Sequence, residues 1–196
     1  ILEGKHPSMF VSASHELSQE YREFERCSTV VANAYIGPKV RGYLGEIGDH
    51  LRRAGFRGSF LVVQSTGGLY EADQAASACV RMLESGPAAG VIGTQALCHA
   101  LSLDNAIAFD MGGTTAKAGV IANGEALTTG AALLGGYEKA LPVQLAMMDI
   151  FEVGTGGGSI ARVEEGTLRV GPLSAGPQPG PACYGLGGTE ATVTDA

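Results

Sequence analysis

The sequence predicts an α/β protein whose second half is rich in β-structure. As far as residue 104, short apolar runs of strand length alternate with segments whose apolar residues recur every three or four positions. After Asn105, short apolar runs follow one another and are separated by glycine-containing turns. With 196 residues, 45% of them hydrophobic, the chain can bury a core and is expected to be one domain or part of a larger one.

The first segments are predicted to be a short strand over 9–14 and then two helices. Aromatic and apolar residues from Tyr21 to Tyr35 mark one helical face, and we expect these side chains to pack in the core. Gly37-Pro38 should interrupt this helix, because proline lacks the N–H that a helix interior needs. A second helix is expected from about 40 to 54.

A buried strand over 60–63 and the loop 64–68 are expected next, followed by a helix over about 71–83. Ser85 is a candidate N-cap for a further helix with Pro87 in its first turn. The second half should contain a meander and then three more strands, at 105–110, 115–121, 125–131, 150–154, 159–164 and 167–170. The last stretch, 171–188, reads as a Pro/Gly-rich loop held to a core by Cys183-Tyr184.

The composition and net charge of the chain argue against several kinds of binding partner and binding site. A net charge of −7 argues against nucleic acid or an anionic membrane as the partner. The four cysteines and four histidines are scattered without metal-ligand spacing, and free thiols suggest a cytoplasmic protein. No apolar run nears the roughly 20 residues of a membrane span. Both ends are abrupt, so we expect a fragment of a longer polypeptide.

The stretch Phe109-Asp110-Met111-Gly112-Gly113-Thr114-Thr115 carries the clearest chemical signal. A strand that ends in an acid, turns at two glycines and returns with threonine hydroxyls can hold a phosphate. The glycines expose backbone N–H groups, the hydroxyls add donors, and the carboxylate can position Mg²⁺ or a water. An ordinary Gly-Gly hairpin between core strands explains the same pattern, and the motif alone leaves both interpretations open.

Two further segments are candidates for function. The glycine cluster Gly156-Gly157-Gly158-Ser159 could offer N–H groups to a phosphate or hold a tight bend against a partner. Asp195 is an isolated acid near the end of the sequence, for which helix capping is the simplest role.

Taken in order, six segments resemble the hydantoinase A/oxoprolinase family, which includes N-methylhydantoinase, 5-oxoprolinase and subunits of acetone and acetophenone carboxylases. The resemblance covers nearly the whole chain. Its segments are Glu23-Phe24-Glu25-Arg26-Cys27-Ser28-Thr29, Gln64-Ser65-Thr66-Gly67-Gly68, Ser85-Gly86-Pro87-Ala88-Ala89-Gly90, the Asp110 motif, Gly156-Gly157-Gly158-Ser159, and Pro179-Gly180-Pro181-Ala182-Cys183-Tyr184-Gly185 with the final Thr192-Val193-Thr194-Asp195-Ala196.

The resemblance implies an actin/Hsp70-like (ribonuclease H-like) ATPase fold, present in part. Residues 1–104 would then be the end of a first lobe with a connecting helix. Residues 105–196 would start a second lobe with its phosphate-binding hairpin. The first lobe of that fold carries an earlier acidic-Gly-Gly-Thr hairpin, and residues 1–105 contain none. Lys117 stands where many family members have an acid, so its role is open.

The resemblance also implies an ATP- and Mg²⁺-dependent hydrolase of cyclic amides of the hydantoin or 5-oxoproline type. Phosphoryl transfer to the carbonyl oxygen makes a leaving group, and water then opens the ring. The expected catalytic residues are Asp110, which is also the expected metal ligand, and Asp195. The expected nucleotide-binding residues are Gly112, Gly113, Thr114, Thr115, Gly156, Gly157, Gly158 and Ser159.

Three other functions stay open. The chain could belong to an ATP-dependent ketone carboxylase subunit, to a non-catalytic ATPase-like scaffold, or to a kinase-like phosphotransferase. The expected partners are a small cyclic amide or ketone and a hydantoinase B-type subunit or domain, without nucleic acid or membrane.

Overall fold

The computed structural model describes residues 2–134 and 140–196 of an α/β chain. These residues form two compact units. The first comprises the chain up to Ile92 together with Leu127–Asp149, and the second comprises Gly93–Ala126 with Ile150–Ala196. The assignment of 1–104 and 105–196 to two ATPase-like lobes stays a prediction.

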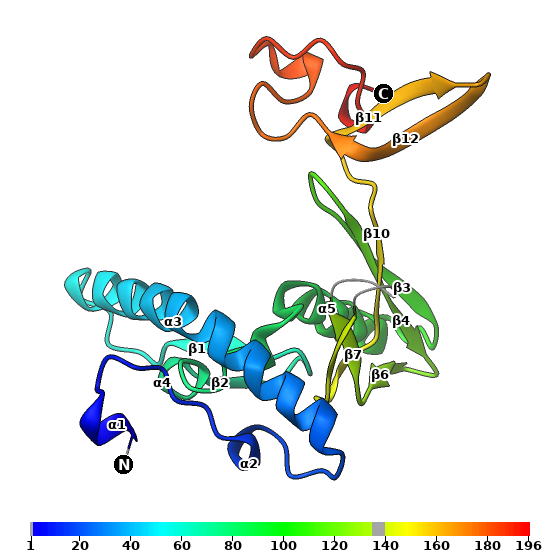
Figure 1. Cartoon of the computed structure of the whole chain (residues 1–196). Helices are drawn as coiled ribbons and strands as arrows, with labels where there is room; N and C mark the ends of the chain where they lie inside the picture. Colours follow the sequence, from blue (N-terminus) through cyan, green and yellow to red (C-terminus); the bar gives the residue numbers. More distant parts are fainter. Residues whose placement is uncertain (1, 135–139) are drawn as a thin grey trace. The chain divides into compact units, whose positions relative to one another are not determined.

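The first unit combines one long helix with short strands and turns (Figure 1). The long helix, α3 (Glu23–Arg53), packs against η1 (Cys79–Met82), β8 (Leu141–Val143) and α2 (Ser14–Leu17). The elements of this unit are α1 (Leu2–Lys5), α2 (Ser14–Leu17), α3 (Glu23–Arg53), β1 (Leu61–Val63), β2 (Leu69–Glu71), α4 (Ala72–Ala75), η1 (Cys79–Met82), the start of α5 (Ser85–Leu101), β6 (Thr128–Thr129), β7 (Ala132–Leu134), β8 (Leu141–Val143) and β9 (Met147–Met148).

Helix α3 runs without interruption through Pro38, so the predicted break there is wrong. Tertiary contacts override the local cost of proline, about 3 kcal/mol. Gly37 packs so closely on the ring of Phe10 that an added Cβ would lie 2.2 Å from it. The segment expected as a strand at 9–14 supplies that ring and is irregular until α2 begins at Ser14.

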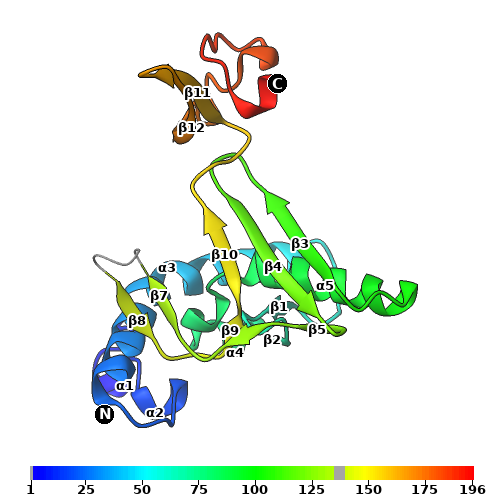
Figure 2. The same ribbon diagram turned by 90° about the vertical axis from the view of Figure 1, so that its right-hand side faces the viewer.

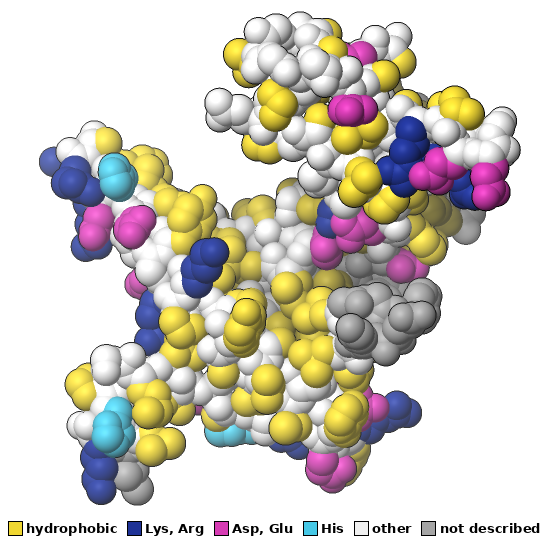
Figure 3. Space-filling model, turned by 45° about the horizontal axis from the view of Figure 1, so that its top comes forward, with side chains coloured by type: hydrophobic (Ala, Val, Ile, Leu, Met, Phe, Trp, Pro, Cys, Tyr) yellow, Lys and Arg dark blue, Asp and Glu magenta, His cyan; other side chains and the backbone are white. Residues whose placement is uncertain are grey.

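The aromatic face of α3 is exposed, which corrects the expectation that it packs in the core. Phe24 is 70% exposed and Tyr35 is 87% exposed. The buried stripe of the helix consists mainly of small and polar residues: Ser28, Thr29, Ala32, Asn33, Gly37 and Leu44. On the face drawn in Figure 3, hydrophobic side chains are likewise spread widely over the surface.

The helix predicted over 71–83 is divided into α4 and η1. Between these two helices and within η1, backbone groups form hydrogen bonds with residues elsewhere in the first unit in place of bonds within one continuous helix. The side chain of Asn33 accepts a hydrogen bond from the N–H of Val80 at 2.9 Å. The N–H and hydroxyl of Ser65 both donate to the carbonyl of Arg81, at 2.7 and 2.8 Å. The next helix, α5, is present as expected with Pro87 in its first turn, but Ser85 is its first helical residue and not the N-cap.

The second unit is built around an antiparallel sheet, with strand order β10-β4-β3 and β5 paired to the far end of β4 (Figure 2). Its strands are β3 (Ala106–Met111), β4 (Ala116–Ala122), β5 (Glu125–Ala126), β10 (Ile150–Val153), and the hairpin of β11 (Ser159–Glu164) and β12 (Thr167–Ser174). The expected meander is confirmed over β3, β4 and β5. The strand expected at 125–131 is divided, because Thr128–Thr129 pairs with β9 in the first unit.

The hairpin turn between β11 and β12 is the one expected from Glu164-Glu165-Gly166. Glu165 and Gly166 both have positive φ, of 51° and 76°. Two such residues form the turn that matches the twist of paired strands. The unit ends in two short helical turns, η2 (Ala182–Tyr184) and η3 (Val193–Asp195). Among the described residues, no helix is both long enough and apolar enough to cross a bilayer.

Candidate functional site

The Asp110 motif forms the expected tight hairpin between β3 and β4. Asp110 pairs with Lys117 and Met111 with Ala116, and then the chain turns through residues 112–115. The N–H of Gly112 donates to the carbonyl of Thr115 at 2.9 Å and closes the turn. The turn therefore has a single backbone conformation fixed from within.

The second glycine cluster binds the back of this turn through backbone groups. The N–H of Gly157 donates to Gly112 O at 2.9 Å, and that of Gly158 donates to Gly113 O at 2.7 Å. A Cβ added at Gly156 would lie 2.6 Å from Gly112 O. Real side chains do not approach backbone atoms so closely, so only glycine permits this contact. The two glycine clusters, more than forty residues apart in sequence, form one site in the second unit.

All four amides of the second cluster have partners inside the protein. Besides the two bonds to the turn, Gly156 N–H donates to the hydroxyl of Ser159 at 2.8 Å, and Ser159 N–H donates to Gly156 O at 3.0 Å. Ser159 itself is fully buried. This arrangement holds the Asp110 turn in position. A direct contact of residues 156–159 with nucleotide stays a prediction.

The turn itself keeps unused donors. Within the described part of the chain, the N–H groups of Gly113 and Thr114 and the hydroxyls of Thr114 and Thr115 have no hydrogen-bond partner. Gly113 and Thr114 are exposed, and Thr115 is half-buried. Successive N–H groups and hydroxyls with this freedom can bind the oxygens of an anion.

A row of charged side chains crosses the sheet next to the turn. Strand register places Asp110, Lys117 and Glu152 side by side on β3, β4 and β10. The Lys117 Nζ lies 3.6 Å from a carboxylate oxygen of Glu152, which answers in part the open question about this lysine. Sequence reasoning missed Glu152, because only the pairing of β10 with β4 brings it to the site.

Asp110 is exposed and belongs to no group of three potential metal ligands within the described residues. Mg²⁺ is commonly held by one or two carboxylates together with phosphate oxygens and water. A single carboxylate beside a turn with unused N–H and hydroxyl donors fits that donor set.

Asp195 binds the Pro/Gly-rich loop of the second unit. Its carboxylate accepts hydrogen bonds from the N–H groups of Cys183 and Thr192, both at 2.8 Å, and of Ala182 at 3.3 Å. The hydroxyl of Thr192 is a fourth donor, also at 2.8 Å. These bonds, that of the Cys183 amide first, hold the pKa of Asp195 well below its usual range. The side chains of Cys183 and Tyr184 are exposed, so the expectation that they hold the loop to a core is wrong. The carboxylate of Asp195 anchors the loop instead.

The neighbouring Thr194 connects this loop to the glycine cluster. Its N–H and its hydroxyl both donate to the carbonyl of Gly157, each at 2.8 Å. The peptide bond between Thr194 and Asp195 and these hydrogen bonds thus connect the loop to Gly157, and the N–H of Gly157 connects to the turn at Gly112. The carboxylate of Asp195 is thus used for contacts within the loop, and a catalytic role for it stays a prediction.

Comparison with known proteins decides the family. Residues 26–196 match the hydantoinase/oxoprolinase family over most of the chain. The chain belongs to the hydantoinase/oxoprolinase family. The resemblance found in the six sequence segments is therefore confirmed.

Three relatives illustrate the range of this hydantoinase/oxoprolinase family. An uncharacterized protein of Methanocaldococcus jannaschii is 46% identical over 95% of this chain, which covers 29% of that protein. The acetophenone carboxylase gamma subunit of Aromatoleum aromaticum is 39% identical, with 95% of this chain and 25% of the subunit covered. The crystal structure of the ATP-dependent caprolactamase from Pseudomonas jessenii superposes with a TM-score of 0.74 at 34% identity, covering 99% of this chain and 28% of that one. The chain thus spans little more than a quarter of the length of these hydantoinase/oxoprolinase relatives.

Proposed function

We propose that the chain is part of an ATP-dependent hydrolase of cyclic amides, in which it supplies a phosphate-binding turn. The observation that carries this proposal is the turn at 112–115, whose unused donors are held in one conformation by the second glycine cluster. The proposal is supported by the 34% identity to a caprolactamase described as ATP-dependent. Caprolactam is itself a cyclic amide.

In this proposal the residues of the turn bind and orient the phosphates. The amides of Gly113 and Thr114 and the hydroxyls of Thr114 and Thr115 donate to β- and γ-phosphate oxygens, and Gly112 shapes the turn. Asp110 would hold Mg²⁺ through its carboxylate. When bound, Mg-ATP supplies the phosphoryl group that makes the unreactive amide oxygen a leaving group. Residues 156–159 keep the donors fixed, so that they need not reorganise during the reaction.

We further propose that residues 1–104 and 105–196 belong to the two lobes of an actin/Hsp70-like ATPase. The α/β architecture and the structural likeness to caprolactamase support this assignment. A second subunit or domain is proposed as the partner, since one relative is named a gamma subunit.

The decisive experiment replaces Asp110 by alanine in the complete protein that carries this chain. We expect ATP-dependent ring opening of lactams and hydantoins to fall roughly 100-fold or more, as when a fixed electrostatic group is removed from an active site. Asp104→Ala is the matched control, because Asp104 is an exposed acid outside the site and should retain full activity. Unchanged turnover in the Asp110 variant would refute the assignment.

A second candidate function is that of an ATP-dependent ketone carboxylase subunit. The 39% identity to the acetophenone carboxylase gamma subunit favours it. Product analysis separates the two functions, because a hydrolase yields a ring-opened amino acid and a carboxylase yields a keto acid. Absence of saturable Mg-ATP binding in calorimetry would instead favour a non-catalytic scaffold.

A further inference from the structure

The row of charged side chains beside the turn contains one ammonium between two carboxylates. Lys117 lies on β4, the central strand, with Asp110 opposite it on β3 and Glu152 opposite it on β10. Residues paired in this way point to the same face of a sheet, and their Cβ atoms are about 4.5–5.5 Å apart. The long side chain of Lys117 can therefore reach either carboxylate.

The structure shows which of these two carboxylates Lys117 contacts. Its Nζ lies 3.6 Å from a carboxylate oxygen of Glu152. Within the described part of the chain, by contrast, the carboxylate of Asp110 has neither a hydrogen-bond partner nor an ion-pair partner. Two acids with equivalent places in the strand register are thus used differently, and only Asp110 keeps its carboxylate available for a ligand.

Burial limits where Lys117 can place its charge. Its side chain is only 20% exposed, whereas that of Glu152 is 48% exposed. A mostly buried ammonium is costly unless an opposite charge lies beside it, so the loss of Glu152 would not simply release Lys117 into water. The other carboxylate of the row is that of Asp110. Lys117 therefore has two alternative partners within the row, and Glu152 decides between them.

We infer that Glu152 is a positioning residue, which holds Lys117 away from Asp110 and so keeps the Asp110 carboxylate available to Mg²⁺. This inference rests on the proposed function, because that function assigns the metal to Asp110. An ammonium paired with Asp110 would compete with the metal for the same oxygens. The Lys117–Glu152 pair also adds no net charge to the row, whereas Glu152 without Lys117 would repel the phosphates at the turn.

The first test needs no nucleotide and measures whether Glu152 controls the partner of Lys117. Asp110→Asn is introduced into the wild type and into Glu152→Gln, and the complete protein is unfolded in urea as a double-mutant cycle. In the wild type this substitution should leave the urea midpoint nearly unchanged, because Asp110 has no partner to lose. In Glu152→Gln it should lower the midpoint, because Lys117 then pairs with Asp110. Equal effects in the two backgrounds would overturn the inference.

The second test measures the consequence for metal binding. The complete protein is titrated in a calorimeter with a non-hydrolysable ATP analogue at several Mg²⁺ concentrations. We expect Glu152→Gln to raise the Mg²⁺ concentration for half-maximal binding about fivefold, the size of effect typical of one partly exposed ion pair. Adding Lys117→Gln to Glu152→Gln removes the competing ammonium and should restore the wild-type Mg²⁺ dependence. A merely structural role of Glu152 gives no such rescue, and a missing rescue would overturn the inference.

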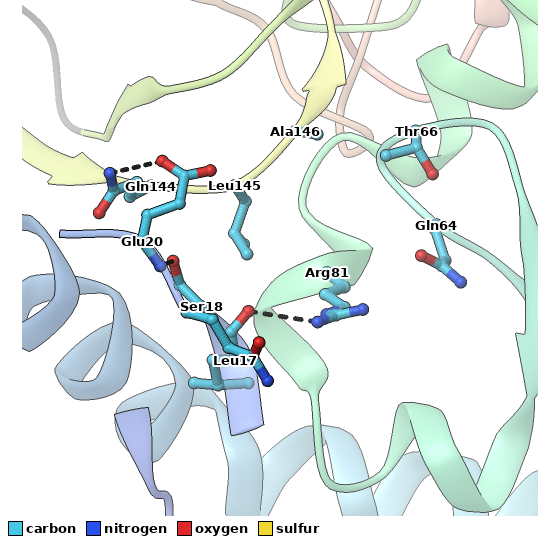
Figure 4. Close-up of a pocket in the computed structure, with 10 residues that line it drawn as sticks. Leu17, Ser18, Glu20, Gln64, Thr66, Arg81, Gln144, Leu145 and Ala146 are labelled. Atoms are coloured by element: carbon cyan, nitrogen blue, oxygen red, sulfur yellow. Dashed lines mark hydrogen bonds between the residues drawn. The ribbon is translucent and has the colours of Figure 1, made fainter. Parts of the chain in front are cut away.

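Two control variants separate this effect from the loss of any carboxylate. Glu164→Gln breaks an ion pair of similar exposure in the same unit, with Arg162 at 2.6 Å, at the end of β11 remote from the glycine cluster. Glu20→Gln removes a carboxylate whose partner is the uncharged Gln144, at 2.7 Å (Figure 4), so it releases no cation. Both should keep the wild-type Mg²⁺ dependence. A shift in either control as large as in Glu152→Gln would contradict a specific role of Glu152.

The two measurements keep this inference and the proposed function distinct. A wild type that binds no nucleotide contradicts the ATP-dependent function, while the urea cycle still decides whether Glu152 holds Lys117 away from Asp110. Nucleotide binding with an unchanged Mg²⁺ dependence in Glu152→Gln overturns the positioning role and leaves the phosphate-binding proposal in place.

Discussion

At the scale of single residues, the candidate site depends on the missing side chain of Gly156. In Gly156→Ala the new Cβ would lie 2.6–2.7 Å from backbone atoms of residues 112–114, which cannot rotate away. We expect a loss of about 2 kcal/mol in unfolding free energy, within the range for overpacked sites, and weaker Mg-ATP binding. Urea denaturation and calorimetry measure the two effects.

Gly93→Ala is the control for this substitution, because a Cβ at Gly93 in α5 meets no atom within 4 Å. It should leave stability unchanged or raise it slightly, since alanine is the better helix former. If both variants behave alike, the close approach of the two glycine clusters is wrong.

Asp195 should make stability depend on pH. Because its folded-state pKa lies below the ordinary value of about 3.9, the carboxylate stabilises the folded state fully above that pH. The contribution is lost as pH falls through the folded pKa. We therefore expect Asp195→Asn to be less stable than the wild type by a constant amount at pH 5–8, with a difference that shrinks below about pH 4. A difference independent of pH across denaturant titrations would contradict this role.

The residues that form the site, and the contacts between them, could be predicted from the sequence only in part. The order Asp-x-Gly-Gly-Thr-Thr between apolar runs was enough to predict the hairpin at 112–115. It could not show that the N–H groups of Gly157 and Gly158 donate hydrogen bonds to that hairpin, because a sequence does not reveal which donors find partners. Glu152 was missed for a related reason, since its place beside Lys117 depends on strand register.

At the scale of elements, helix α3 carries its stabilising contacts on a polar stripe. Asn33 is fully buried and bonds to Ser12, to the carbonyl of Ser77 and to the N–H of Val80, at 2.9–3.0 Å. Asn33→Ala leaves buried groups unpaired, and we expect it to cost about 2–3 kcal/mol in unfolding free energy. Tyr35→Ala on the exposed face should change stability by less than about 0.5 kcal/mol. Denaturant titration of both variants tests the orientation of the helix, and the reverse order would show that the aromatic face is the buried one.

The same helix shows why element prediction was uneven. Its periodic aromatic residues identified a helix correctly but not the face that is buried, because a period carries no information about what lies opposite. Pro38 predicted a break from local chemistry, whereas the contacts of Gly37 and Asn33 with distant segments keep the helix continuous. Strand β11 and the compact turn after it depend on local signals and were predicted closely, whereas β12 runs on to Ser174 and takes in the start of the segment expected as a loop from residue 171.

At the scale of the whole molecule, the chain consists of two compact units, each made of two separate stretches of sequence. We expect them to open as distinct cooperative units. In hydrogen exchange followed by mass spectrometry, Gly156→Ala should reduce protection mainly in Gly93–Ala126 and Ile150–Ala196. Asn33→Ala should act mainly on the other unit. Uniform loss of protection in both variants would indicate a single cooperative unit.

This division could not be read from the sequence, which changes character only once, near residue 105. The α/β class, the β-rich second half and the family followed from local patterns and ordered motifs. The return of Leu127–Asp149 to the first unit depends on pairings such as β6 with β9, which join short strands of weak local signal.

The hydrogen bonds between the turn and the second glycine cluster join main-chain atoms only. The shape of the turn is therefore largely indifferent to the identity of the side chains around it. Such a chain is free to exchange the groups that select a substrate while the backbone cradle stays the same. We therefore expect side chains around the turn to tolerate substitution, whereas the glycines that form these contacts should not.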